Sequence, residues 1–375
     1  MITFQNLTFG GTFSYETHDL PPPPANYLWA WGVNYHGRLG LGNTTGYSSP
    51  KQVGDLITWS SVNAGYFHSS AIKTDGTLWT WGRNYAGGLG LGNTIDRSSP
   101  VQVGTDTTWL SVAASGYSNM AIKTNGTLWG WGRNSYGRLG LNGTSFYSSP
   151  NQVGALNTWL NVAAGGYFSM AIKTNGTMWA VGGRNIGGNL GDGTTTNKSS
   201  PVQVGALTNW LSVSAGNYYT IANKTDGTIW TWGGNSYGQL GQGDTANRSS
   251  PVQVGALTTW SSIASGDNHN MAIKIDGTLW SWGYNGDGQL GDGTTTNKSS
   301  PVQIGALTTW SKISGGYFSM AIKTDGTLWS WGYNNKGQLG DGTTINKSSP
   351  VQVGALTTWS SVSAGRLHSL AIIEE

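Results

Sequence analysis

The sequence contains no cysteine, which excludes disulfides and thiolate-bound metals. Charged residues make up only 10% of the 375 residues, and the formal net charge is +3. Lys and Arg are scattered along the chain without a basic run, which argues against nucleic-acid binding through phosphate neutralisation. No apolar run approaches the roughly 20 residues that span a bilayer. The composition therefore predicts neither a nucleic-acid partner nor membrane insertion.

The first 26 residues lie outside the pattern that fills the rest of the chain. They lack a basic segment followed by an apolar core, so no secretory signal peptide is visible. Four consecutive prolines at 21–24 predict a stiff, extended spacer. Two interpretations stay open for residues 1–26: an arm packed against the first repeat, or a segment that docks onto a partner or a larger assembly.

From residue 27 onward the chain repeats one unit of about 50 residues. The clearest marker is the first Trp of a Leu-Trp-x-Trp-Gly element or its variants. This marker recurs at Trp29, Trp79, Trp129, Trp179, Trp230, Trp280 and Trp329. A period this constant indicates a repeat architecture rather than two or more separate domains.

Each unit predicts four short strands. In one unit they cover residues 59–65, 69–74, 77–81 and 101–103. Asp75-Gly76 predicts a type I′ hairpin turn, with both central residues at positive φ. Four antiparallel strands in each repeat match the blade of a β-propeller. Small residues in the first strand suit the crowded axis, and the tryptophans suit the wider space between blades.

Counting the strands predicts how the ring closes. The chain begins with a third and a fourth strand within residues 27–53, and it ends with a first and a second strand within residues 359–373. Joined together, these strands complete a seventh blade and leave no unpaired sheet edge. The prediction is an all-β, seven-bladed propeller formed by residues 27–375 as a single domain.

The repeated elements resemble the regulator of chromosome condensation repeat family. The resemblance rests on Leu-Trp-Ser-Trp-Gly-Tyr-Asn at 279–285, Gly-Gln-Leu-Gly at 288–291 and Ala-Gly-Arg-Leu-His at 364–368. It extends over about residues 27–373 and implies a seven-bladed propeller. The founding eukaryotic member is a nucleotide-exchange factor on chromatin, but its acidic contacts, insertions and basic tail have no counterpart here. The uniform repeats look closer to bacterial or viral members, which include a secreted β-lactamase inhibitor.

The candidate binding site lies in the Gly-x-x-His loops, which alternation of strand direction places at one end of every blade. Two consecutive positions in these loops vary between repeats and are mostly aromatic. We predict that they form a ring around the axis opening and bind a partner; the alternative is that they only plug the tunnel. The candidates are Phe67, His68, Tyr117, Tyr167, Phe168, Tyr218, Tyr219, His269, Tyr317, Phe318 and His368.

No catalytic constellation stands out, and no cofactor is predicted. The three histidines of the ring come from separate blades without accompanying carboxylates, so they do not predict a metal site. The overall prediction is a non-catalytic recognition or structural propeller that binds a protein or glycan, with a cell surface or virion favoured over the cytoplasm as its location. The alternative is a soluble protein-binding propeller that acts as an enzyme inhibitor or resembles a nucleotide-exchange factor.

Overall fold

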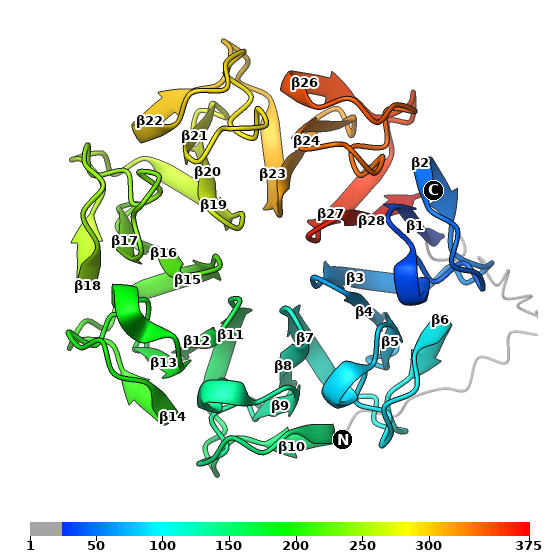
Figure 1. Cartoon of the computed structure of the whole chain (residues 1–375), viewed down its shortest axis with the longest axis horizontal. Coiled ribbons are helices and arrows are strands. Elements are labelled where there is room, and N and C mark those ends of the chain that lie inside the picture. The colour runs from blue at the N-terminus through cyan, green and yellow to red at the C-terminus, as the bar shows by residue number, and fades with distance from the viewer. Residues whose placement is uncertain (1–24) are drawn as a thin grey trace, which may run out of the picture.

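The computed structural model describes residues 25–375 and shows seven four-stranded antiparallel sheets arranged as blades around an axis (Figure 1). The predicted fold is confirmed. The first complete blade contains β3 (Trp59–Ala64), β4 (His68–Lys73), β5 (Leu78–Gly82) and β6 (Arg97–Gln102), ordered from the axis outward. The predicted N-terminal arm, 1–26, lies almost wholly outside the described residues.

The next five blades repeat this order. Their strands are β7 (Trp109–Ala114), β8 (Ser118–Lys123), β9 (Leu128–Gly132), β10 (Tyr147–Gln152), β11 (Trp159–Ala164), β12 (Phe168–Lys173), β13 (Met178–Gly182), β14 (Lys198–Gln203), β15 (Trp210–Ala215), β16 (Tyr219–Lys224), β17 (Ile229–Gly233), β18 (Arg248–Gln253), β19 (Trp260–Ser265), β20 (His269–Lys274), β21 (Leu279–Gly283), β22 (Lys298–Gln303), β23 (Trp310–Gly315), β24 (Phe318–Lys323), β25 (Leu328–Gly332) and β26 (Lys347–Gln352). Short 3₁₀ helices lie in four of the loops after the third strand: η1 (Tyr35–Gly37), η2 (Tyr85–Gly87), η3 (Ser135–Gly137) and η4 (Asn185–Gly187).

The two ends of the chain share the last blade. Its order is β2 (Tyr47–Gln52), β1 (Asn26–Gly32), β28 (His368–Glu374) and β27 (Trp359–Ala364). Leu28 pairs with Ile372 along an uninterrupted antiparallel register. Beyond it, Ala25 and Glu375 exchange two backbone hydrogen bonds of 2.8 and 3.0 Å. The predicted closure by head and tail strands is confirmed.

Residue size sets the radial position of each strand. The inner strands surround an axial channel of about 290 Å³ lined largely by Ala, Ser, Val and Gly. Further out, Trp59 is buried and meets Trp79 edge-on at 6.2 Å and Trp81 at 6.2 Å. The same triad recurs in the other blades except where Val181 replaces its second indole. The tryptophans therefore pack within and between blades, as predicted, and form the core.

Two local predictions need correction. In the turn at 75–76 only Gly76 has a positive φ, 78°, so the turn is not type I′. The Asp75 carboxylate instead accepts hydrogen bonds from the backbone N–H and the hydroxyl of Thr77, which hold the turn and lower the pKa of Asp75. The outermost strand also starts earlier than predicted and includes Pro100, which an edge strand tolerates. Within residues 25–375, no helix is long and apolar enough to cross a bilayer.

Candidate functional site

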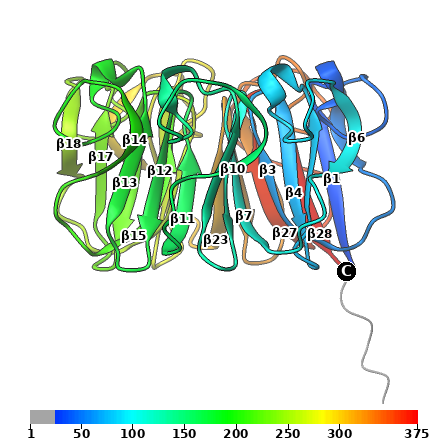
Figure 2. The ribbon, with the colours of Figure 1, turned by 90° about the horizontal axis from the view of Figure 1, so that it is seen from below.

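The loops after the first and third strands of each blade meet on one side of the disc, which we call the loop face. Arg83 N–H donates to the Phe67 carbonyl at 3.0 Å, and Val33 N–H donates to the Leu367 carbonyl at 2.8 Å. These bonds tie the two loops of a blade together. Figure 2 shows the loops with 3₁₀ helices on the side of the disc opposite the C-terminus.

Six of the eleven predicted site residues are buried below this face. They are His68, Phe168, Tyr219, His269, Phe318 and His368, each at most 1% exposed. Each occupies the first position of a second strand and points into the blade interface. Burial keeps these six side chains out of the open ring predicted on the loop face, so that part of the prediction is corrected, and only His269 borders a pocket, described below.

The buried set connects neighbouring blades. His368 Nε2 lies 2.9 Å from the Ser69 hydroxyl, and His269 Nε2 lies 2.8 Å from the Ser319 hydroxyl. The Tyr219 hydroxyl donates to the His269 carbonyl at 2.5 Å. Burial lowers the pKa of His269 to about 4, so the ring is neutral at physiological pH. This layer has a structural role.

The other five predicted residues lie half-buried on the loop face: Phe67, Tyr117, Tyr167, Tyr218 and Tyr317. Phe67 stacks on Tyr117 with centroids 4.7 Å apart, and Tyr167 stacks on Tyr218 at 5.1 Å. Both pairs bridge neighbouring blades. The aromatic ring predicted around the axis therefore exists in part, with two stacked pairs as its most ordered section.

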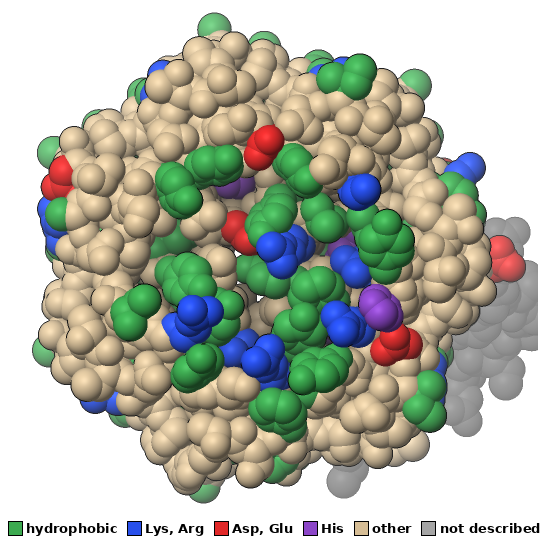
Figure 3. All heavy atoms as spheres, viewed as in Figure 1, with side chains coloured by type: hydrophobic (Ala, Val, Ile, Leu, Met, Phe, Trp, Pro, Cys, Tyr) green, Lys and Arg blue, Asp and Glu red, His purple; other side chains and the backbone are tan. Residues whose placement is uncertain are grey.

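Sequence reasoning missed a cluster of arginines on the same face. Six of the eight arginines in the chain gather there, and Figure 3 shows basic and hydrophobic side chains around the central opening. They are Arg38, Arg83, Arg133, Arg138, Arg184 and Arg366. Within residues 25–375, none of the six has a carboxylate within 4.0 Å. The basic residues are thus scattered in the sequence but not in space.

Five of these arginines lie against the stacked pairs, and three of the five, Arg83, Arg133 and Arg184, are not buried. The guanidinium carbon of Arg83 is 5.6 Å from the Phe67 ring and 5.7 Å from the Tyr117 ring. The guanidinium carbon of Arg184 is 4.6 Å from the Tyr167 ring. We call the set the arginine–aromatic arc, and it consists of Phe67, Arg83, Tyr117, Arg133, Tyr167, Arg184 and Tyr218.

Arg38 and Arg138 support the arc from below. Both are 2% exposed. Arg38 Nη1 donates to the Tyr66 carbonyl at 2.9 Å, and Arg138 Nη1 donates to the Gly166 carbonyl at 2.7 Å. Burial lowers the pKa of each to about 10, so both remain charged at neutral pH. They hold the loops in place and add positive potential beneath the arc.

The opposite half of the loop face contains a pocket of about 370 Å³. We call it the tyrosine–aspartate pocket, after Tyr237, Asp267, Tyr284, Asp287, Tyr317 and Tyr333. His269, Asn268 and Gln289 complete much of its lining. This half therefore carries carboxylates where the arc carries guanidinium groups.

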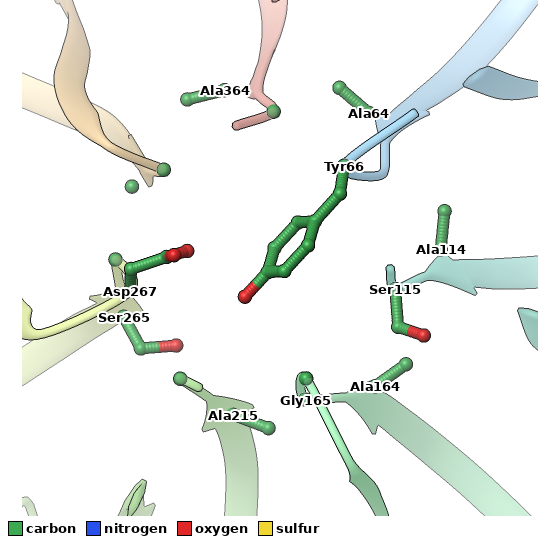
Figure 4. A pocket seen from close by; sticks show the side chains of 16 residues that line it. Ala64, Tyr66, Ala114, Ser115, Ala164, Gly165, Ala215, Ser265, Asp267 and Ala364 are labelled. Carbon is green, nitrogen blue, oxygen red and sulfur yellow. The ribbon is translucent and has the colours of Figure 1, made fainter. Parts of the chain in front are cut away.

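Asp267 lies between this pocket and the axial opening. Figure 4 shows its carboxylate and the Tyr66 ring projecting into the opening above the small residues of the inner strands. Asp267 is 7% exposed. Burial raises its pKa to about 7, while Arg366 and the Tyr66 and Tyr317 phenols partly offset that rise. The phenols are close enough to favour the charged carboxylate, yet its Oδ2 atom accepts no hydrogen bond from the described residues.

The missed residues at the surface occupy two variable positions of the repeat, while Arg38 and Arg138 occupy a third, four residues after the loop Asn. One lies two residues before the buried ring position and holds Tyr66, Asn217, Asp267 and Arg366, with Gly in the other repeats. The other directly precedes the loop Asn and holds Arg83, Arg133, Arg184, Tyr284 and Tyr333, among others. Their changing charge within a uniform framework was the available signal. Within residues 25–375, no group of three His, Cys, Asp or Glu side chains is placed to hold a metal ion.

Comparison with known proteins identifies the family. The model of the RCC1-like domain matches residues 25–316, and that of the regulator of chromosome condensation (RCC1) repeat matches residues 325–372. The chain belongs to the RCC1 repeat family. No curated protein sequence matches the chain.

Solved RCC1-like structures share its fold. Yeast RCC1 (Prp20), solved bound to Kap60, is 20% identical with a TM-score of 0.84, and the match covers 94% of this chain and 89% of that one. A second structure, Prp20p from Saccharomyces cerevisiae, has the same identity and TM-score, with 94% and 92% covered. Human WBSCR16 is 21% identical with a TM-score of 0.84, and the match covers 94% and 99%. These matches come from yeast and human, and a particular closeness to bacterial or viral RCC1 members is not among them.

Proposed function

We propose that this RCC1-family propeller is a non-catalytic binding module whose loop face captures a protein partner through an acidic segment. The observation that carries the proposal is the arginine–aromatic arc, whose guanidinium groups lie on aromatic rings with no carboxylate of residues 25–375 beside them. Arg and Tyr are enriched among the residues that dominate binding energy at protein interfaces.

Stacking makes the arc suited to carboxylates. A guanidinium held against a ring keeps its N–H edge free and loses little conformational freedom when it binds a carboxylate in a bidentate manner. Arg133 is further restrained, because its Nε donates to the Ser135 hydroxyl at 3.0 Å. Acidic side chains of a partner would pair with these groups, and the neighbouring tyrosines would supply apolar contact area.

The yeast relatives favour a protein as the partner. One was solved in complex with Kap60, and the other is described with its binding properties to Gsp1p and histones. At 20% identity these proteins share only the fold, so they indicate a kind of partner and not a particular one. A glycan or a single-stranded nucleic acid stacked on the tyrosines would be a competing ligand, and the test below separates the acidic peptide from the nucleic acid.

The test uses a fluorescein-labelled peptide rich in Glu and Asp, the same peptide with Gln and Asn, and an oligodeoxynucleotide of equal charge. Fluorescence anisotropy is measured at low and at physiological salt. We expect binding of the acidic peptide only, with a loss of about tenfold or more in the variant Arg83→Ala/Arg133→Ala/Arg184→Ala. The matched control replaces Lys198, Lys298 and Lys347 with Ala, because these lysines already face Asp192, Asp292 and Asp341 at 3.5 Å. Equal binding by both variants, or tighter binding of the oligonucleotide, would contradict the proposal.

Attachment to a cell surface or virion is a second part of the proposal, motivated by the single non-repeating segment 1–26. Removal of this segment tests it. Loss of assembly with unchanged peptide binding supports an anchoring role. Unchanged assembly supports the alternative of a soluble inhibitor or exchange-factor-like protein. The proposed closeness to bacterial or viral family members is tested by the genomic locus, and an intron-containing eukaryotic locus would contradict it.

A further inference from the structure

The tyrosine–aspartate pocket has two aromatic walls. Tyr237 and Tyr284 meet edge-on with centroids 5.0 Å apart, and Tyr317 and Tyr333 meet edge-on at 6.3 Å. The first pair joins two neighbouring blades, whereas the second lies within one blade, because Tyr317 follows β23 and Tyr333 follows β25 of the same sheet. Between them lies the cavity of about 370 Å³. Ring faces attract cations electrostatically, most strongly where water is excluded.

The pocket also holds two carboxylates in different states. Asp287 is fixed, because its Oδ1 accepts from Asn346 at 3.0 Å and its Oδ2 accepts from Gln289 at 3.3 Å. Asp267 is deeper, 7% exposed, and its Oδ2 accepts no hydrogen bond from residues 25–375, although the Tyr66 and Tyr317 phenols lie near the carboxyl. A buried carboxylate with an unsatisfied oxygen is costly, whereas one that meets a cation is compensated. The two carboxylates disfavour an anion in the pocket and favour a cation between the tyrosine pairs.

We propose that this pocket binds an alkylammonium group, presented by a lysine side chain of a protein partner. The group would lie between the tyrosine pairs, with Asp267 and Asp287 as its counter-charges. The choice of a protein as the source rests on the proposed function, whereas the recognition of an alkylammonium group does not. A free quaternary amine shares the chemistry and forms a separate arm of the test.

Two ionisable neighbours of Asp267, Arg366 and His269, affect how strongly the pocket can bind a cation. The guanidinium carbon of Arg366 lies 4.5 Å from the Tyr317 ring and 5.4 Å from the Tyr66 ring. It has no carboxylate within 4.0 Å among the described residues, so it does not neutralise Asp267 directly. His269 is neutral at physiological pH, because burial lowers its pKa to about 4. Arg366 nevertheless weakens any cation in the pocket, and it limits the expected affinity.

The experiment titrates the full chain with four small probes by isothermal titration calorimetry at about pH 8, where Asp267 is mostly ionised. The probes are Nα-acetyl-lysine amide, its Nε-trimethyl form, choline and the neutral Nα-acetyl-norleucine amide. We expect the lysine probes to bind about threefold to thirtyfold more tightly than norleucine amide. Binding of choline alone would assign the pocket to a free amine. Equal binding of norleucine amide, or no binding of any cationic probe, would overturn the proposal.

Three variants locate the binding. Asp287→Asn and Tyr284→Leu should each lower the affinity for the lysine probes about threefold or more. The matched control is Asp55→Asn, which removes one exposed carboxylate on the side of the disc opposite the loop face, at a position where the other repeats have Ala or, once, Thr105. Thermal melts check that each variant folds. Loss of affinity in the control alone would contradict the assignment. Acidic-peptide binding should survive Asp287→Asn, so this inference and the proposed function fail separately.

Discussion

The arginine–aromatic arc and the tyrosine–aspartate pocket occupy equivalent parts of different blades, except that one blade contributes Tyr218 to the arc and Tyr237 to the pocket. The position directly before the loop Asn is Arg83 and Arg133 in the arc, but Tyr284 and Tyr333 in the pocket. The backbone follows the same plan at Arg83, Arg133 and Tyr284, where each N–H donates to a carbonyl in the first loop of its blade. The repeat therefore provides equivalent backbone positions, and the side chain at each position determines whether that part of the loop face binds negative or positive groups.

The buried side chains beneath the arc and the pocket also differ in charge. Arg38 and Arg138 lie under the arc, while Gln239 and Gln289 take the equivalent position under the pocket. The Gln289 side chain accepts from the Asp287 backbone N–H at 2.9 Å and donates to its carboxylate. The neutral Gln289 amide thus holds the Asp287 loop without cancelling its charge, whereas an arginine at this position would neutralise it. The comparison teaches that both the surface and its support determine the sign of each half.

The largest effect is expected from reversing the charge of the arc. In the variant Arg83→Glu/Arg133→Glu/Arg184→Glu, affinity for the acidic peptide should fall about a hundredfold or more, because attraction becomes repulsion. Binding of the lysine probe should change by less than about twofold, since the pocket lies on other blades. Anisotropy and calorimetry on the same preparation measure both. A parallel loss of both ligands would show that the halves do not act separately.

Replacing the pocket residues that directly precede the loop Asn with arginine should make the pocket resemble the arginine–aromatic arc. The variant Tyr284→Arg/Tyr333→Arg places guanidinium groups where the arc has them and removes one ring from each pair of the pocket. Affinity for the lysine probe should fall about tenfold, and binding of the acidic peptide should increase. Calorimetry with both probes measures the change. Retained lysine binding would mean that the tyrosine rings do not form the site.

A change in pH should affect the pocket and spare the arc. Asp267, whose pKa burial raises to about 7, takes up a proton as the pH falls from about 8 to 5.5, so lysine-probe affinity should fall several-fold. His269, with a pKa of about 4, and Tyr66, with a pKa well above its usual value, do not titrate in this range. Calorimetry at both pH values, repeated with Asp267→Asn, measures the effect. A pH dependence that persists in this variant would exclude Asp267 as its cause.

Ionisation of Asp267 should favour lysine binding but lower the stability of the fold. Its folded pKa exceeds its unfolded value of about 3.9, so the folded chain holds the proton more tightly. Its ionisation therefore costs up to about 4 kcal/mol of stability as the pH rises from 4 through 7. Compared with the parent chain, Asp267→Asn should be more stable at about pH 8 and similar at about pH 4 in urea titrations.

The smallest effect on binding is expected from the buried layer that both halves share. His68→Ala leaves Asn119, whose side chain lies 3.1 Å from the His68 ring nitrogen, without that partner. The free energy of unfolding should fall by about 1–3 kcal/mol, while both probes bind within about twofold of the parent. Denaturant unfolding and calorimetry measure the two quantities. A large loss of binding would give the buried ring residues a direct functional role.

The fold was predictable because its signals are local and repeated. Trp79 and Trp81 mark the third strand, Ser and Ala mark the inner strand, and the count of strands at the two ends required a shared blade. The turn type was missed because the Asp75 carboxylate bonds to Thr77 and leaves only Gly76 at positive φ. A dipeptide does not reveal that choice.

The site was predictable only in part. Phe67 and His68 are consecutive, but Phe67 ends the loop and is half-buried on the loop face, whereas His68 begins β4 and is buried. Treating them as one ring combined two layers. The arginines were missed for a different reason: Arg83, Arg133 and Arg184 are about 50 residues apart, and only the blade period brings them together. Aligning the repeats with one another, position by position, would have shown it.

The two backbone hydrogen bonds between Ala25 and Glu375 hold both ends of the described chain side by side, so the chain can be opened at another loop without loss of the ring. A circular permutant that links these residues and opens at the Asp75-Gly76 turn would keep every strand pairing outside that turn. Its new ends would emerge from the side of the disc away from both binding regions. The order of the seven blades in the gene could therefore be rotated without changing what the assembled surface presents.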